Sequence, residues 1–580
     1  MNLELQNIQF FLENSFQTNP ITQLRIVHVG GTNGKGSVCS LISSVLYNSG
    51  YKVGTFNSPH FIEPRDAIRI NNNQISYKDH IRIRKDILEK TKKIQLDQEN
   101  NQKMSTSFSL SNFETSFAEM LIWFVENKVD IAVLEVGVGG RRDATNVFDY
   151  KYSLQPDSNS NFQIESNNDF SRNSLVQCIC SIGPDHFGLI GNSLAEIAVE
   201  KMGIARHNSV LIVGQQAEES VLSTINEQAK NLVNKTVIDA SKGWELLKND
   251  QDLCLNNQSI CSSSSSNPKL KISINPQYLF NDKKFSDSFF LQKLCSTDSF
   301  IPSTFDVLPL VLNGSYQAQN AAIAFYALLS LSVFHNFNKI TLESIEKGYL
   351  NTRWPGRLTW IQLSSKLDND CHTKNAKIIN FPSSDLINSS EIIILVDGAH
   401  NPPAASELKK YVDYTQNEIN KKSENVTLNR KRWIVGFTAG KNIKEIFSIL
   451  WEFGSNDELW IVPFNQPEEM PWINSMDPNS IRDTLLLLHK NNLERNQNEL
   501  DFNAEKDTSV GNSSRSVPNI KVFNNISDIL KELFQSKEKH EDGFLNIVCG
   551  SLYLVSDLFR ELDIEIWKDF VDTKKVLNLK

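Results

Sequence analysis

The stretch HVGGTNGKGSVCSLI, residues 28–42, has the composition of a loop that binds phosphate groups. Glycine N–H groups can surround phosphate oxygens, and the N-terminus of a following helix adds partial positive charge. In the ordinary P-loop a metal-binding hydroxyl directly follows the phosphate-binding lysine. Here Gly36 separates Lys35 from Ser37. A lysine and a hydroxyl at a strand-to-helix junction favour nucleotide binding over a simple glycine turn, but the loop alone leaves the class of nucleotide-binding protein open.

Two further residues follow strand-like segments and could ligate a divalent metal ion. Glu135 in LEVGVGG ends an apolar run, where a carboxylate is costly unless it is paired or bound to metal. His186 in GPDHFG follows another such run and could ligate a second ion as a neutral imidazole. Ligands of open α/β sheets gather at the carboxyl ends of the strands, so both residues are expected at one edge. Taken singly, each has a commoner interpretation: a paired carboxylate at a strand end, and a lone loop histidine.

Lys201 lies in the helical pattern AVEKMGI with apolar neighbours. A buried lysine needs a partner, a shifted pKa or a covalent modification. The alternative is a snorkelling lysine whose ammonium group stays in water.

Another set of charged residues occurs late in the chain. Arg357 in WPGRL, and Asp397 and His400 in VDGAHNP, offer a guanidinium, a carboxylate and an imidazole beyond a strand end. Singly they mean little. Two α/β domains that each carry a charged edge favour a substrate cleft between them.

These residues are separated by a repeated strand–loop–helix pattern, which predicts βαβ units and a mainly parallel sheet. The strand-like runs span residues 24–31, 129–140, 175–186, 209–216, 391–402, 430–440, 457–465 and 543–562. The gap in the series predicts two α/β domains that meet just before residue 352. Four polar segments lack the apolar residues to fold alone and are expected to be surface insertions; they lie near residues 155–174, 255–268, 366–375 and 491–519.

The composition narrows the class of protein further. A net charge of −9 and the lack of a basic stripe argue against a nucleic-acid partner. The eight cysteines form no C-x-x-C pair, so we interpret them as free thiols in a reducing compartment. The N-terminus lacks a secretory signal, and no uninterrupted apolar run reaches membrane-spanning length. We expect a cytoplasmic monomer without a membrane partner, with a mitochondrial location left open.

Taken together, the motifs resemble the Mur ligase superfamily, and more closely its folate branch of dihydrofolate synthases and folylpolyglutamate synthases. The matching segments occur in the family's order from His28 to Val555; they are HVGGTNGKGS, NSPHF, RDAIRI, LEVGVGGRRDATN, GPDH, EIAVEKMGI, LNGSYQAQNAAIA, RWPGRL, LVDGAHNP and CGSLYLV. The resemblance implies a P-loop-type ATPase domain over residues 1–350 and a smaller Rossmann-like ligase domain over residues 351–580. It also implies an ATP-dependent amide ligase, which phosphorylates a substrate carboxylate before the amino group of glutamate attacks.

The resemblance implies a role for each matching residue. Residues that would contact ATP are Thr32, Asn33, Gly34, Lys35, Gly36, Ser37, Asn320, Arg357, Asp397 and His400. Two Mg²⁺ ions would be held by Ser37, Ser58, Glu135 and His186. Lys35, Glu135, His186 and Lys201 would carry catalysis. Lys201 matches a lysine that relatives carry as a carbamate, a group that could support the metal site.

The chain departs from the family pattern at a few positions. Arg142 stands where an apolar residue is expected, Tyr316 where histidine is frequent, and Pro184 where leucine or threonine is usual. None of these removes an expected ligand. Asn33 in the loop, a short N-terminus and the segment EEMPWI are more similar to stand-alone, fungus-like dihydrofolate synthases than to eukaryotic polyglutamate synthases.

The favoured substrates are therefore 7,8-dihydropteroate, L-glutamate and ATP. The alternatives are a folylpolyglutamate synthase acting on tetrahydrofolate, an enzyme with both activities, and an inactive nucleotide-binding regulator. The regulator should have lost Lys35, Glu135 or His186, and all three are present.

Overall fold

The computed structural model divides into two units, unit 1 with Met1–Trp354 and Trp567–Lys580, and unit 2 with Pro355–Ile566. The division lies four residues beyond the expected boundary at 350, and unit 1 also takes Trp567, which the sequence placed in the second domain. The structure describes residues 5–100, 108–148, 173–185, 187–207, 209–230, 236–242, 244–247, 269–272, 305–364, 376–379, 382, 391–422, 428–451, 456–503, 519–538, 543–564 and 566–567. Three of the four predicted insertions lie almost wholly outside these residues.

Unit 1 is built on an eight-stranded sheet in the order β4-β3-β2-β5-β1-β6-β7-β8, with a separate three-stranded antiparallel sheet, β11-β10-β9. The strands are β1 Ile26–Gly30, β2 Val53–Phe56, β3 Ile68–Ile70, β4 Asn73–Gln74, β5 Ile131–Glu135, β6 Ser174–Ile179, β7 Val210–Val213, β8 Thr236–Asp239, β9 Trp244–Leu247, β10 Lys269–Ile272 and β11 Phe305–Pro309. The helices are α1 Gln6–Ser15, α2 Lys35–Asn48, α3 Tyr77–Asn100, α4 Asn112–Glu126, α5 Leu194–Met202, α6 Glu219–Lys230, α10 Tyr316–His335 and α11 Leu342–Asn351. From β2 to β8 the neighbouring strands are parallel, as the βαβ pattern predicts.

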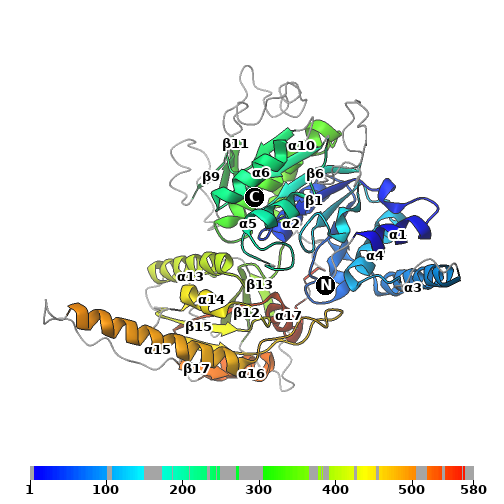
Figure 1. Cartoon of the computed structure of the whole chain (residues 1–580). Helices are drawn as coiled ribbons and strands as arrows, with labels where there is room; N and C mark the ends of the chain where they lie inside the picture. The colour runs from blue at the N-terminus through cyan, green and yellow to red at the C-terminus, as the bar shows by residue number, and fades with distance from the viewer. Residues whose placement is uncertain are drawn as a thin grey trace, which may run out of the picture. The chain divides into compact units, whose positions relative to one another are not determined.

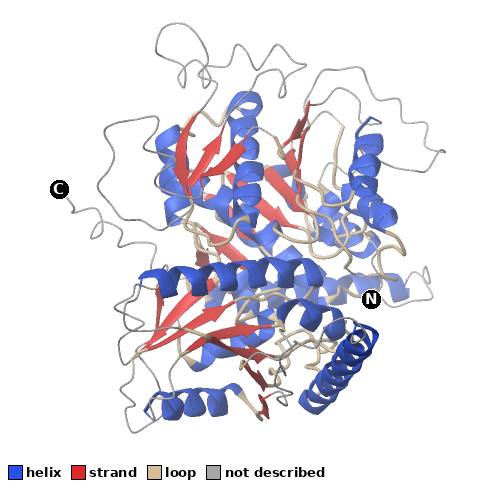
Figure 2. Cartoon of the chain, turned by 90° about the vertical axis from the view of Figure 1, so that its left-hand side faces the viewer, coloured by secondary structure: helices blue, strands red, loops and turns tan. Residues whose placement is uncertain are grey.

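The central strands of unit 1 are buried on both faces. In β1, Val27 and Val29 pack in a core with α2 and α10, whereas Ile26 packs in a core with α1 and α4. Each fully buried valine or isoleucine contributes about 1.5–3 kcal/mol. Parallel strands covered by helices on both faces read as continuous apolar runs, which is why the sequence showed them so clearly. Figure 2 shows the strands lying among helices.

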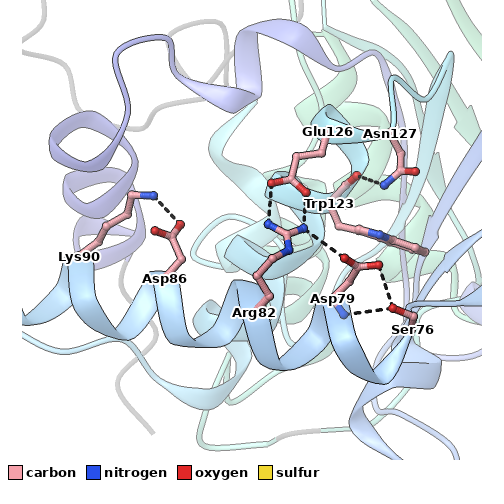
Figure 3. Close-up of polar contacts among 8 residues, drawn as sticks. All are labelled: Ser76, Asp79, Arg82, Asp86, Lys90, Trp123, Glu126 and Asn127. Atoms are coloured by element: carbon pink, nitrogen blue, oxygen red, sulfur yellow. Dashed lines mark hydrogen bonds and ion pairs between the residues drawn. The ribbon is translucent and has the colours of Figure 1, made fainter.

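α3 lies at the periphery of unit 1 (Figure 1). Its buried residues Ile83, Ile87 and Ile94 pack in one core with α4, and polar contacts also join the two helices. Arg82 donates to both carboxylate oxygens of Glu126, at 3.1 and 2.6 Å, and also to Asp79 (Figure 3). Closer to the core, the fully buried carboxylate of Glu119 is paired with His80 and Arg84. Basic side chains of α3 therefore lie on a helix face that is paired with acidic side chains of α4.

One helix among the described residues, α10, is long and apolar enough to cross a membrane by length and composition alone. Of its 18-residue apolar window, 78% is buried inside the structure, which is also typical of the core helix of a soluble protein. Its apolar side chains contact those of α2 and β6 in the main core.

Unit 2 is a seven-stranded sheet in the order β13-β12-β14-β18-β15-β16-β17, in which β12 is antiparallel to both neighbours and the other pairs are parallel. The strands are β12 Thr359–Leu363, β13 Ala376–Ile379, β14 Ile392–Val396, β15 Arg430–Val435, β16 Glu458–Ile461, β17 Asn519–Val522 and β18 Phe544–Cys549. The helices are α13 Pro402–Lys422, α14 Ile443–Leu450, α15 Pro478–Asn503, α16 Ile526–Glu538 and α17 Leu552–Glu561. The expected insertion at 491–519 is helical as far as Asn503, because residues 491–503 contain no proline or glycine to end α15.

Candidate active site

The glycine loop joins β1 to α2 and is held against the residues that follow β6. The backbone N–H groups of Thr32 and Asn33 donate to the carbonyl of Ser181, at 2.8 and 3.3 Å. Gly34 caps α2 with φ 93°, a left-handed conformation that favours glycine. A Cβ atom there would also collide with the side-chain oxygen of Asn320 on α10. The predicted nucleotide residues Thr32 to Ser37 and Asn320 thus come together at the N-terminus of α2.

Lys35 and Glu135 face each other across this loop. The Lys35 ammonium lies 3.9 Å from Glu135 Oε1 and donates a hydrogen bond of 3.2 Å to the carbonyl of Thr32. Glu135 is the last residue of β5, and only 5% of it is exposed. A buried carboxylate beside a lysine at a helix N-terminus is suited to hold a metal ion against phosphate groups.

Ser58 follows β2, the strand beside β5. Its neighbour Asn57 donates a hydrogen bond of 2.8 Å to Glu135 Oε2, so this loop reaches the same carboxylate. Ser58 Oγ is buried and has no hydrogen-bond partner within the described residues. An orphaned hydroxyl is costly unless a ligand or ion satisfies it, so Ser58, Glu135 and the buried Ser37 fit a Mg²⁺ site.

The protein side chains supply only part of the ligands that a Mg²⁺ ion would need. No cluster of three or more His, Cys, Asp or Glu side chains in the described part of the chain could hold a metal ion. Mg²⁺ commonly takes one or two carboxylates and completes its shell with water and substrate phosphates, so a sparse set suits it. His186, the expected ligand of a second ion, lies outside the described residues.

Lys201 on α5 is 3% exposed, which rules out the snorkelling interpretation. Its ammonium donates a hydrogen bond of 2.8 Å to the carbonyl of Gly31 in the glycine loop. Burial, with the charge of Lys35 as a second cause, lowers the pKa of Lys201 to about 7. Such a lysine has a substantial neutral fraction at neutral pH, and the neutral amine is its nucleophilic form.

The late charged group assembles within unit 2. Asp397 directly follows β14, is 5% exposed, and accepts a hydrogen bond of 2.9 Å from the N–H of Leu358. Burial raises the pKa of Asp397, and the nearby Arg357 guanidinium opposes that rise. A Cβ on Gly398 would meet Arg357 Nη1 at 2.5 Å, and His400 Nδ1 is hydrogen-bonded to the Gly398 carbonyl at 2.8 Å. The side chains of Arg357, Asp397 and His400 therefore lie around the backbone turn at Gly398.

Sequence reasoning missed two residues that hold the site together. Asn57 and Arg69 lie in the quoted motifs NSPHF and RDAIRI, but their single positions gave no sign that Arg69 donates to Asn57 and Asn57 to Glu135. The pairing of β2 with both β3 and β5 brings them together, and the sequence did not predict β2 and β3.

Glu200 was also missed. Its carboxylate is 3% exposed on the side chain and accepts from Arg141 Nε at 3.2 Å and from the backbone N–H of Arg142 at 3.1 Å. Arg142, the residue that departs from the family pattern, adds a contact of 3.4 Å through Nε. This departure therefore has a structural partner on α5.

The sequence of this chain is similar to those of known proteins. The family model described as "Dihydrofolate synthetase, C-terminal domain" matches residues 378–561. The probable dihydrofolate synthetase of Schizosaccharomyces pombe is 29% identical over 548 residues, covering 94% of this chain and 96% of that protein. The dihydrofolate synthetase of Saccharomyces cerevisiae is 27% identical over 543 residues, covering 93% of this chain and 94% of that protein. The chain is therefore similar, over nearly its whole length, to the dihydrofolate synthetases of two fungi.

A solved structure has a similar fold over nearly the whole chain. The bifunctional folylpolyglutamate synthase/dihydrofolate synthase of Yersinia pestis, solved with AMPPNP and a Mn ion, superposes with a TM-score of 0.57 at 19% identity. The match covers 97% of this chain and 94% of that chain, so both α/β units have their counterparts in this folate-branch enzyme.

Proposed function

We propose that this protein is a dihydrofolate synthase, an ATP-dependent ligase that joins L-glutamate to 7,8-dihydropteroate to give 7,8-dihydrofolate. The observation that carries the proposal is the Lys35–Glu135 pair at the N-terminus of α2. The choice of substrate is supported by the likeness to two fungal dihydrofolate synthetases over at least 93% of the chain.

In the proposed reaction a carboxylate oxygen of dihydropteroate attacks the γ-phosphorus of ATP, and ADP leaves. The amino group of glutamate then attacks the acyl carbon and loses a proton, and phosphate leaves with the former carboxylate oxygen. Lys35 and the N–H groups of the loop hold the triphosphate and balance its charge. A bound Mg²⁺, held by Glu135, Ser37 and Ser58, and a second ion at His186 would supply further charge neutralisation.

Within unit 2, Arg357, Asp397 and His400 are the proposed nucleotide-binding residues. Arg357 offers a planar guanidinium suited to phosphate, and Asp397 orders the turn at Leu358 that carries it. A cytoplasmic location and a monomeric state remain predictions.

We further propose that Lys201 is carbamylated in the active enzyme. Its lowered pKa provides the neutral amine that adds to CO₂, with loss of one proton, and the product is an anionic group beside the loop. Enzyme freed of bicarbonate should lose activity and regain it when bicarbonate is added. Lys201→Ala should be inactive and partly restored by short carboxylates; full activity of that variant would remove the idea.

The substrate proposal is tested by giving purified protein ATP, Mg²⁺ and glutamate with either dihydropteroate or tetrahydrofolate. Amide formed from dihydropteroate alone supports the proposal, and amide formed from both identifies a bifunctional enzyme, the activity named for the Yersinia pestis protein. Product from tetrahydrofolate but none from dihydropteroate would assign the protein as a folylpolyglutamate synthase instead.

A further inference from the structure

Arg69 on β3 controls the orientation of the amide that holds Glu135. The guanidinium is 2% exposed and donates to the carbonyl of Asp66 and to the side-chain oxygen of Asn57. Because the Asn57 oxygen accepts from Arg69, its NH₂ group faces Glu135 and donates to Oε2 at 2.8 Å. Arg69 thereby fixes the face of Glu135 that remains directed to Lys35.

The Arg69 cation is covered by an aromatic ring from the other end of the chain. Its guanidinium carbon lies 4.2 Å from the ring centroid of Trp567, a residue of unit 1. Within the described residues no carboxylate lies close enough to Arg69 to form an ion pair. Burial lowers the pKa of Arg69 to about 10, and the charges of Asp66, Cys39 and Glu135 oppose that fall. Tryptophan provides the strongest cation–π face, most of all for a desolvated cation, so the Trp567 ring is suited to stabilise the buried guanidinium together with these charges.

The contact is not arranged for stability alone. Arg69 Nε and Trp567 Nε1 are both buried, and neither has an acceptor in the described part of the structure. A buried N–H group without an acceptor reduces stability, and a packing contact could be made without two of them. What the arrangement does achieve is a fixed plane for the guanidinium that bonds Asn57.

We infer that Trp567 is a positioning residue for the ligation reaction. Its indole holds Arg69, Arg69 orients the amide of Asn57, and Asn57 holds Glu135 opposite Lys35. The inference rests on the proposed function, in which Glu135 holds Mg²⁺ against the triphosphate.

The test is a double-mutant cycle on the full chain with Trp567→Ala and Asn57→Ala. Two quantities are measured: kcat of the ligation, and the affinity for Mn²⁺ in the presence of AMPPNP, followed by electron paramagnetic resonance. Groups that orient a metal ligand change activity or affinity by roughly 10–100-fold, so Trp567→Ala should lower both by about tenfold with the KM for glutamate unchanged. In the Asn57→Ala background, Trp567→Ala should lower kcat and Mn²⁺ affinity by less than about a further twofold. Asn57→Ala has already removed the amide through which Trp567 acts on Glu135.

Two variants make the cycle specific. Trp567→Phe keeps an aromatic face over Arg69 and should retain most of the activity, whereas Trp567→Leu keeps apolar volume without that face and should behave like Trp567→Ala. Trp567→Leu also replaces Trp567→Ala if the latter does not fold. Tyr414→Ala removes a 53% exposed ring on α13 and should leave both quantities unchanged.

Independent losses that multiply in the double variant would overturn the inference. So would a lower melting temperature with unchanged Mn²⁺ affinity, which marks a purely structural role. A wild-type protein that makes no amide would contradict the proposed function instead, and the Mn²⁺ measurements would still decide whether Trp567 acts through Asn57.

Discussion

The indole of Trp354 occupies the space that a Cβ atom on Gly36 would need. Gly36 lies in the first turn of α2, and Trp354 is packed against the same core cluster. With Trp354 in this position, a residue larger than glycine after Lys35 would collide with its ring. The order Lys-Gly-Ser, with the hydroxyl one position later at Ser37, therefore fits the packing of Trp354 against α2.

Gly36→Ala should destabilise unit 1 and weaken ATP binding, because the methyl group forces the Trp354 ring away. Overpacking of this kind costs about 1–3 kcal/mol. The loss should be smaller in the double variant Gly36→Ala/Trp354→Val, which makes room for the methyl group. Chemical unfolding and ATP titration are compared for the wild type, Gly36→Ala, Trp354→Val and the double variant. If the losses of stability and ATP affinity in the two single variants simply add in the double variant, the two residues do not interfere.

Lys35→Ala should lower ATP turnover by about 100- to 1,000-fold, the range for removing one preorganised charge-stabilising donor. The result also separates a ligase from a nucleotide-binding regulator. Lys347→Ala, which removes a 54% exposed lysine paired with Glu343, is the matched control and should behave as wild type. Turnover that is no lower in Lys35→Ala than in the control would refute the catalytic interpretation.

Glu200→Ala should destabilise unit 1 by about 1–3 kcal/mol, because the backbone N–H of Arg142 and two guanidinium groups lose a buried acceptor. Arg142→Leu should change stability by less than about 1 kcal/mol and keep the activity, since its side chain is 40% exposed. Thermal unfolding and the ligation assay compare the two variants. A large loss of activity in Arg142→Leu would instead indicate that Arg142 contacts substrate.

His28 should make the stability of the folded state around β1 fall at acidic pH. Burial lowers the pKa of His28 to about 3, with the Arg206 charge as a second cause, against 6.5 for the free side chain. Between these values the unfolded chain binds a proton that the folded chain does not, so stability falls as pH drops from about 6.5 toward 3. The slope from one such group approaches about 1.4 kcal/mol per pH unit.

Hydrogen exchange of the β1 peptide at pH 7.5 and 5 checks this prediction against His28→Gln, which has no imidazole to protonate. The wild type should lose more protection than the variant on acidification. Equal losses in the two proteins would show that His28 does not carry the pH dependence.

The sequence predicted the fold where the strands are continuous apolar runs, as in β1, β5 and β6, and it predicted the residues at their carboxyl ends. It could not predict β2 and β3, which are short and interrupted by polar residues such as Thr55 and Arg69. The relation of Asn57 to Glu135 depends on that pairing and was missed with it.

The burial of Lys201 could not be predicted from the sequence either. Nothing in AVEKMGI distinguishes a snorkelling lysine from a buried one. The distinction depends on how α5 packs against the glycine loop, where Lys201 meets the carbonyl of Gly31.

The most direct test of the central claim follows one oxygen atom. Dihydropteroate labelled with ¹⁸O in its carboxylate is given to the enzyme with ATP, Mg²⁺ and glutamate, and the phosphate released is analysed by mass spectrometry. Ligation through an acyl phosphate predicts one ¹⁸O atom in each phosphate released with an amide product. Amide formation with unlabelled phosphate, or ATP hydrolysis without amide, would contradict the account.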